Sequence, residues 1–334
     1  MRRGRHPAQR HASGRRHGAH GREPRPVNAV VRTTTAADDP ALAALWRRCF
    51  VAPHLSDLHA LDPERHRHTF VAENAEGDGI DAVVVYVPRL IRDASGAPQR
   101  VGGIGSVATR PEARGRGLIR LLLAAAERTM SAEQCAWSLL FTGTPGVYRS
   151  SGWEEFTRSY TEGALARSTG PAAFPVREAA PDDAAEVAAL HHAYNARRPL
   201  TSLREPGDWA VRVPAWYGPA ERPLVTVDPV SGALTGWIVA QHLADCVEVR
   251  EFAGEADCLG PLLGAVGSRA RAAGISRARV PGLPEMEGAL PRLLTDARRV
   301  TEHTGMARPL HAAAASVRAT VTAPGAVHWY GDCF

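Results

Sequence analysis

Apolar residues along this chain form short strand-like runs and longer helical patterns, in an order that occurs twice. In the first half a short apolar run leads to a helix pattern that Asp38 or Asp39 can cap. Further runs rich in Val, Ile and Ala predict strands, and a leucine-rich helix pattern separates the last two. The predicted strands are 30–34, 69–72, 82–91, 101–107 and 136–142, and the predicted helices cover 40–49 and begin again at 118.

The same order returns after a Pro/Ala linker at 171–175. Residues 176–183 (VREAAPDD) resemble residues 31–39 (VRTTTAADD), and the later elements follow in parallel. They are strands at 224–227, 233–241, 246–252 and 276–280, with a helix at 258–273. We therefore expect an α/β fold with a mixed sheet in two tandem copies, one in 27–170 and one in 176–334.

Composition supports a globular protein of the cytoplasm. The chain has 334 residues, of which 44% are hydrophobic, enough for a sizeable core. Its five cysteines are scattered, with no C-x-x-C pair, which argues for reduced thiols and against a zinc site. No apolar run is long enough to predict a membrane span.

Charge is concentrated at the start of the chain. Residues 1–26 hold eight arginines and one acidic residue, Glu23, so the remainder is net negative although the whole chain is +5. This segment has almost no apolar side chains and is expected to be a disordered basic tail. A nucleic-acid or membrane-surface arm is one interpretation, and a dispensable tail is the one we favour. The globular part is not predicted to bind nucleic acid.

Four histidines cluster in 51–68, among acidic residues and prolines. Their spacing fits no helical or hairpin set of metal ligands, so a solvated loop or helix is the favoured interpretation and we expect no metal.

The most informative stretch, residues 101–130, is VGGIGSVATRPEARGRGLIRLLLAAAERTM. A strand pattern leads through a polar turn to Arg114-Gly115-Arg116-Gly117 and then to a helix. Glycines let the backbone approach an anion, and the free N–H groups of a helix start carry its positive end. On these residues alone, a phosphate-binding loop and a tight turn with solvated arginines both remain open. The chain has no lysine for a GxxxxGK[ST] loop, and Arg120 stands where GxGxxG needs glycine.

Residues 107–120 (VATRPEARGRGLIR) resemble motif A of the GNAT acyltransferases, whose core is [RQ]-x-x-G-x-[GA]. Arg114 matches the first position and Gly117 the fourth, whereas Ile119 stands where a small residue is usual. With isoleucine at this position, the motif resembles that of the branch typified by the enhanced-intracellular-survival acetyltransferases. The resemblance implies acetyl-coenzyme A as co-substrate. The residues that it implies for binding are Val107, Arg114, Gly115, Arg116, Gly117, Leu118, Ile119 and Thr144.

The second copy lacks this loop. Residues 254–257 (GEAD) stand at the corresponding helix start, and two carboxylates there would repel a pyrophosphate. We expect this copy to be degenerate and not to bind the cofactor. Three tryptophans of this half, at 209, 216 and 237, are expected in the core, with Trp209 or Trp216 as an alternative lining of a pocket mouth.

Tyr148 and the turn Gly152-Trp153 follow the strand at 136–142. Alone, Tyr148 would be interpreted as a half-buried tyrosine that anchors the turn. Its position resembles the GNAT tyrosine that protonates the departing thiolate, which implies a general acid.

The sequence ends in an aromatic-rich segment, VHWYGDCF, at 327–334. On the residues alone, docking of an apolar tail and a catalytic use of the last residue are both open. The resemblance implies that the segment returns to the first active site, where the α-carboxylate of Phe334 would act as general base. Asp332 is expected to help bind a cationic acceptor.

The implied function is acetyl transfer from acetyl-coenzyme A to a primary amine of a small molecule, directly and without a covalent enzyme intermediate. The alternatives are an aminoacyl-tRNA-dependent transferase and a non-catalytic acyl-coenzyme A-binding protein. The sequence does not identify the amine, and it leaves a homo-oligomer open.

Overall fold

The computed structural model describes residues 29–50, 55–74, 79–167, 174–218 and 221–334. The expected basic tail at 1–26 and most of the linker at 171–175 lie outside these residues. Within them, no helix combines the length and the apolar character needed to cross a membrane.

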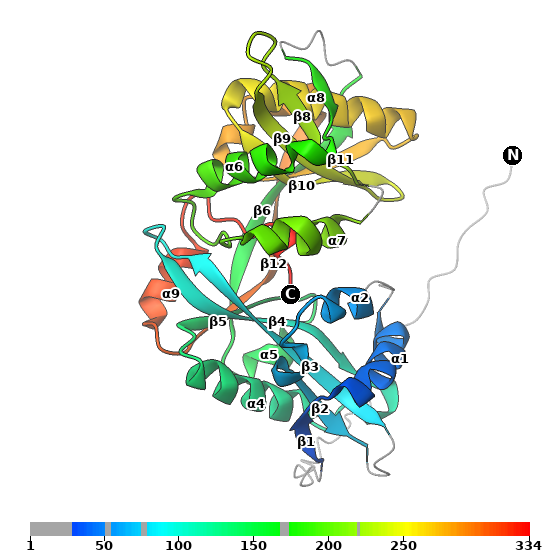
Figure 1. Cartoon of the computed structure of the whole chain (residues 1–334), viewed down its shortest axis with the longest axis vertical. Helices are drawn as coiled ribbons and strands as arrows, with labels where there is room; N and C mark the ends of the chain where they lie inside the picture. The colour runs from blue at the N-terminus through cyan, green and yellow to red at the C-terminus, as the bar shows by residue number, and fades with distance from the viewer. Residues whose placement is uncertain (1–28, 51–54, 75–78, 168–173, 219–220) are drawn as a thin grey trace, which may run out of the picture.

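One mixed sheet of twelve strands runs through both lobes of the molecule (Figure 1). Its order is β1-β2-β3-β4-β5-β12-β6-β11-β10-β9-β8-β7. Among the strands that the structure describes, only β4–β5 and β10–β11 are parallel pairs, and a long helix connects the two strands of each. The strands are β1 (Val31–Thr33), β2 (Thr69–Glu73), β3 (Ile80–Arg92), β4 (Pro98–Thr109), β5 (Trp137–Phe141), β6 (Glu154–Leu165), β7 (Val176–Glu178), β8 (Leu224–Val227), β9 (Leu234–His242), β10 (Cys246–Gly254), β11 (Arg277–Pro281) and β12 (Leu294–Pro309).

The last strand of each half lies beside a strand of the other half. β6 follows β5 in sequence but pairs with β11, and β12 pairs with β5, placing Gly305 opposite Phe141. The two exchanged strands also pair with each other over most of their length. The mixed α/β fold is confirmed, and the two halves of the chain are joined through exchanged strands.

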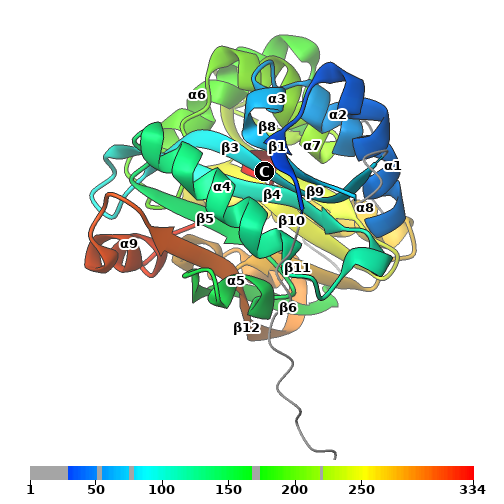
Figure 2. The ribbon, with the colours of Figure 1, turned by 90° about the horizontal axis from the view of Figure 1, so that it is seen from below.

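Helices cover both faces of the sheet. In the first lobe α4 crosses one face, and α1 and α2 lie over the other (Figure 2). The helices are α1 (Asp39–Cys49), α2 (Leu55–Ala60), α3 (Arg65–His68), α4 (Leu118–Ala132), α5 (Gly146–Arg149), α6 (Ala184–Asn195), α7 (Val213–Tyr217), α8 (Ala256–Ala272) and α9 (Ala314–Val321).

Strand β3 is buried on both faces, which explains its continuous apolar run. Val84 and Tyr86 pack with the leucines of α4, whereas Val83 and Val85 pack with α1. On β4, Ile104 packs in the α4 cluster, whereas its neighbours Gly103 and Gly105 face the other side of the sheet. Successive strand residues point to opposite faces, so the two faces of β4 have different partners.

The two similar segments of the sequence, 31–39 and 176–183, form corresponding hydrogen bonds. Arg32 binds Asp38 at 2.8 Å, and Arg177, the corresponding residue, binds Asp183. The same aspartates accept the backbone N–H groups of Thr35 and Ala180 at 2.7 and 2.6 Å. Each unit therefore begins with an arginine that fixes the carboxylate at the start of its first helix.

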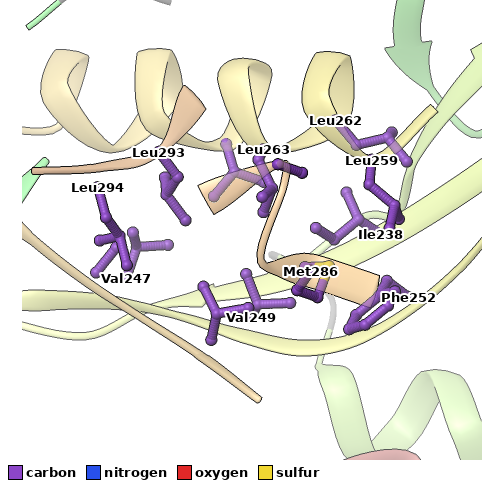
Figure 3. Close-up of a cluster of buried hydrophobic side chains, with 14 of the residues drawn as sticks. Ile238, Val247, Val249, Phe252, Leu259, Leu262, Leu263, Met286, Leu293 and Leu294 are labelled. Carbon is purple, nitrogen blue, oxygen red and sulfur yellow. The ribbon is translucent and has the colours of Figure 1, made fainter. Parts of the chain in front are cut away.

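The second lobe has its own apolar core beneath α8, where Leu259, Leu262 and Leu263 face the sheet (Figure 3). At the end of β10, Phe252 packs with Met286 and with Trp329 of the C-terminal segment. Apolar side chains thus occupy the end of this parallel pair. Trp237 is fully buried, as expected from the sequence.

Every strand predicted from the sequence is present, within a few residues of its predicted ends. The two exchanged strands, β6 and β12, were not predicted.

Candidate functional site

The glycine-rich loop connects the end of β4 to α4. Gly115 and Gly117 have φ values of +75° and +76°, which disfavour any residue with a Cβ. No other atom lies within 4 Å of the Cβ position of either glycine. The loop thus presents bare backbone to open space at the N-terminus of a 15-residue helix. This arrangement suits an anion such as a pyrophosphate.

The two loop arginines differ in their contacts. Arg116 binds Asp81 at 2.8 Å, and Arg110 lies 3.9 Å from the same carboxylate. Arg114 is exposed, and its Nε donates to the carbonyl oxygen of Thr109 at 3.4 Å. Arg116 is therefore held at the start of β3, and Arg114 is the better placed of the two to meet a ligand at the loop.

Strands β4 and β5 part next to this loop. Their pairing covers only Val101 to Gly103 on β4. Beyond it β4 forms a bulge against β3, with Ser106 at φ +51° and its carbonyl oxygen accepting the indole N–H of Trp46 at 2.9 Å. Such bulges redirect a strand near functional sites. The end of β4, including Val107, has no strand paired with it on the β5 side among the described residues.

The last residue of the sequence, Phe334, lies on β4 where the strands part. A Cβ on Gly103 would overlap the Phe334 ring, and a Cβ on Gly105 would overlap its main-chain carbonyl group. The ring also packs against His328, with centroids 5.2 Å apart. Figure 1 shows this end of the chain between the two lobes. These two glycines are therefore needed for close approach of the C-terminal segment.

A buried ionic cluster holds this segment to the second lobe. Arg204 donates to Asp332 at 2.7 Å and to Glu251 at 2.8 Å, and all three side chains have no exposed surface. His191 Nδ1 lies 2.8 Å from Glu251, whose other oxygen accepts the hydroxyl of Tyr217. Burial acts to raise the pKa of each carboxyl, but the charge of Arg204 holds the pKa of both below their ordinary values.

This cluster corrects the role expected for Asp332. Its carboxylate is fully buried and paired with Arg204, so it is not presented to a cationic acceptor. Its position instead fixes the backbone two residues before Phe334. Trp209 also belongs here, since Arg204 lies over its ring at 4.8 Å, whereas Trp216 lines a cavity.

Tyr148 lies on α5, in the apolar cluster on the α4 side of the sheet, and is 7% exposed. Burial raises its pKa to about 12, and a hydrogen bond with Thr142 partly opposes this. The phenol is therefore protonated at neutral pH. Thr144 is exposed in the turn between β5 and α5, where its amide donates to Thr142 at 3.0 Å. Leu118 is buried and Ile119 half-buried, so their side chains belong to the core.

The loop and Tyr148 thus lie on one side of the sheet, and Phe334 lies on the other. On the Phe334 side, a cavity of about 500 Å³ extends between α2, β3 and the segment 205–216. A second cavity, of about 640 Å³, begins at the end of β5. Cys333 lines both, so the C-terminal segment separates them.

Several lining residues of the 500 Å³ cavity were not singled out from the sequence. They are Arg89 on β3, Glu205, Asp208 and Arg212 in the second unit, and Ser106 at the bulge. They come from segments more than 100 residues apart, so no local motif could have identified them.

Comparison with known proteins agrees with this architecture. Residues 30–156 match the family model of the acetyltransferase (GNAT) domain. No curated protein sequence matches the chain.

Three solved structures have folds similar to this one. Each is 20% identical to this chain or less, so the likeness shows a shared fold alone. One is a conserved protein of unknown function from Enterococcus faecalis V583, a probable N-acyltransferase (16% identity, TM-score 0.67, 85% of this chain and 73% of that one). Another is a GCN5-related N-acetyltransferase from Kribbella flavida (20%, 0.64, 86% and 73%). A third is Eis1 from Mycobacterium abscessus (14%, 0.59, 84% and 74%).

The ionic cluster predicts how stability depends on pH. Both carboxyl groups have lowered pKa values in the folded protein, so their contribution is present above their ordinary pKa values of 3.8 and 4.5. It is lost as the pH falls through the folded values, because the unfolded chain takes up the protons first. We expect Asp332→Asn to cost about 1–3 kcal/mol at pH 7, since it replaces the charged acceptor of a buried Arg204 hydrogen bond by a neutral amide.

Chemical denaturation at pH 7 and at pH 3 measures both effects. The loss of stability between these pH values should be smaller in Asp332→Asn than in the unmodified protein. Asp245→Asn, an exposed position, is the control and should change stability by less than about 0.5 kcal/mol. Equal stability of Asp332→Asn and the unmodified protein at pH 7 would show that the cluster does not hold the segment.

Proposed function

We propose that this chain, whose residues 30–156 match the family model of the acetyltransferase (GNAT) domain, transfers an acetyl group from acetyl-coenzyme A to a primary amine of a small molecule. The observation that carries this proposal is the placement of Phe334 on β4 where β4 and β5 part, opposite the loop and Tyr148. A donor and an acceptor can then meet through the gap from opposite sides of the sheet.

The loop is the proposed site of the coenzyme A pyrophosphate. Backbone amides of 115–119 are the proposed donors, since the space beside Gly115 and Gly117 at this helix start is open, and Arg114 adds a positive charge in the loop. Thr144, in the turn after β5, is a further residue that we propose for binding coenzyme A. An acyl thioester bound there would lie along the unpaired end of β4, where a backbone N–H near Val107 can polarise its carbonyl.

The chemistry requires a base for the ammonium group and an acid for the thiolate. The main-chain carboxyl group of Phe334 is the proposed base, since its carbonyl lies against Gly105 on the acceptor side. The freed amine then attacks the thioester carbonyl directly. The tetrahedral intermediate collapses with cleavage of the C–S bond and departure of the thiolate, and the nitrogen loses its second proton to solvent. Tyr148, on the donor side and protonated at neutral pH, supplies the thiolate's proton. Holding both reactants at the gap provides much of the rate enhancement.

A panel of primary amines tests the function directly. We expect release of coenzyme A thiol from acetyl-coenzyme A in the presence of responsive amines, together with a mass gain of one acetyl group on the amine. Coenzyme A binding without turnover on any amine would favour the non-catalytic binding protein. Transfer that requires aminoacyl-tRNA would favour the tRNA-dependent transferase.

Replacing Tyr148 by phenylalanine removes the proposed acid while keeping the ring in its cluster. We expect kcat to fall about 100-fold or more, with little change in the KM for acetyl-coenzyme A. Tyr194→Phe, in the second lobe, is the matched control and should keep full activity. An unchanged kcat in Tyr148→Phe would remove this residue as the acid.

Adding Gly-Ser after Phe334 moves the carboxyl group away from Gly105. We expect kcat to fall about 100-fold, because an amide carbonyl cannot accept the ammonium proton. The same dipeptide placed before Met1 should have no effect. Full activity of the C-terminally extended protein would exclude this carboxyl group as the base.

A further inference from the structure

Arg89 stands at the end of an apolar stripe on β3. Val85, Val87 and Arg89 alternate along the strand, so they share one face, and all three line the 500 Å³ cavity that holds Phe334. A cavity of this size accommodates a small-molecule ligand. The stripe therefore gives this cavity an apolar floor that ends in a cation.

The guanidinium group of Arg89 has no ionic partner in the described part of the chain. It donates to the carbonyl oxygen of Pro88 at 2.9 Å, and its buried Nε has no hydrogen-bond partner. No described side-chain carboxylate lies within 4.0 Å of it. Burial, and then the nearby charge of Arg212, lower the pKa of Arg89 to about 10. A buried charge without a partner is costly, so proteins normally pair it.

Arg212, which lines the same cavity, also has guanidinium nitrogens without hydrogen-bond partners in the part of the chain that the structure describes. Its Nε donates to Asp208 at 2.8 Å, but both terminal nitrogens are buried without a hydrogen-bond partner among the described residues. Arg212 comes from the second unit and Arg89 from the first, and each acts electrostatically on the other. Two guanidinium groups with unused donors thus line one cavity.

The other charged groups of this cavity are carboxylates. Asp62, Glu205 and Asp208 line it together with Phe334, and Asp208 is the one that binds Arg212. Burial lowers the pKa of His59 to about 4, so this imidazole is neutral at pH 7. A cavity with both kinds of charge and an apolar floor fits a ligand that carries both charges on an apolar body.

We propose that the acceptor carries an anionic group, a carboxylate or a phosphonate, that binds Arg89 and Arg212 while its amine faces Phe334. This inference rests on the proposed function, since it names the class of amine used at the same site. The fork of a guanidinium matches two oxygens of such an anion. A ligand with several positive charges and no anion would place a cation against both arginines.

Matched acceptors test this assignment. Phenylalanine, its aminophosphonate analogue and phenethylamine share one apolar body and one amine, and differ in the anionic group. We expect kcat/KM to be at least 10-fold higher for an anionic member than for phenethylamine. The member with the higher value identifies the anion as carboxylate or phosphonate.

Arg89→Gln should lower kcat/KM about 10- to 100-fold for the anionic acceptors, through KM, and leave phenethylamine unchanged. Arg212→Gln should act in the same direction and keeps the test available if the first variant does not fold. Arg47→Gln, on the exposed face of α1, is the control and should change kcat/KM neither for the anionic acceptors nor for phenethylamine.

Product binding tests the subsite without turnover. Calorimetry should show tighter binding of N-acetylphenylalanine than of N-phenethylacetamide, with the difference lost in Arg89→Gln. Equal kcat/KM for charged and uncharged acceptors, or equal binding of the two products, would overturn the inference and leave the proposed function standing. Preferential binding of the acidic product with no turnover of any amine would instead contradict the proposed function alone.

Discussion

A buried guanidinium group between two carboxylates positions the candidate site. Arg204 binds Asp332 of the C-terminal segment and Glu251 of β10, and none of the three side chains has exposed surface. Loss of Arg204 would leave two carboxylates buried together, and loss of either carboxylate would leave a buried guanidinium donor without its acceptor, so the cluster fixes one placement of the segment. The last two residues then cross from the second lobe onto β4 of the first. The glycines at 103 and 105 leave the space that Phe334 occupies.

The two halves have a similar order of elements but differ at the end of their parallel strand pair. The first has the open glycine loop and the gap between β4 and β5. In the second, Phe252, Met286 and Trp329 fill the corresponding end of β10, and α8 begins with Glu255 and Asp257. The second unit supplies Arg204 and Arg212 instead, and with them the anchor of the C-terminal segment and one wall of the cavity.

Local patterns predicted the strands other than β6 and β12, and the glycine loop, because strand periodicity and glycine at a helix start are local signals. The exchanged strands β6 and β12 were missed, because EEFTRSYTEGAL and LTDARRVTEHTGMARP are largely polar and half-exposed. The residues proposed for cofactor binding lie in one stretch, 101–153, and were predicted from it. The residues proposed for acceptor binding were not predicted. Arg89, Arg212 and the partner of Asp332 are brought together only by tertiary structure, so Asp332 appeared to be a ligand residue when its charge is already satisfied.

The strand exchange also determines the order in which this chain can fold. β5 cannot complete its pairing until β12 is available, and Phe141 is opposite Gly305, far along the chain. During synthesis the first unit therefore emerges with an open sheet edge that its own β6 does not cover. Contacts of such long sequence separation slow folding, and an uncovered edge invites pairing with other chains. The same exchange between two copies would produce a domain-swapped dimer, so the short distance between the halves within one chain favours the monomeric pairing kinetically.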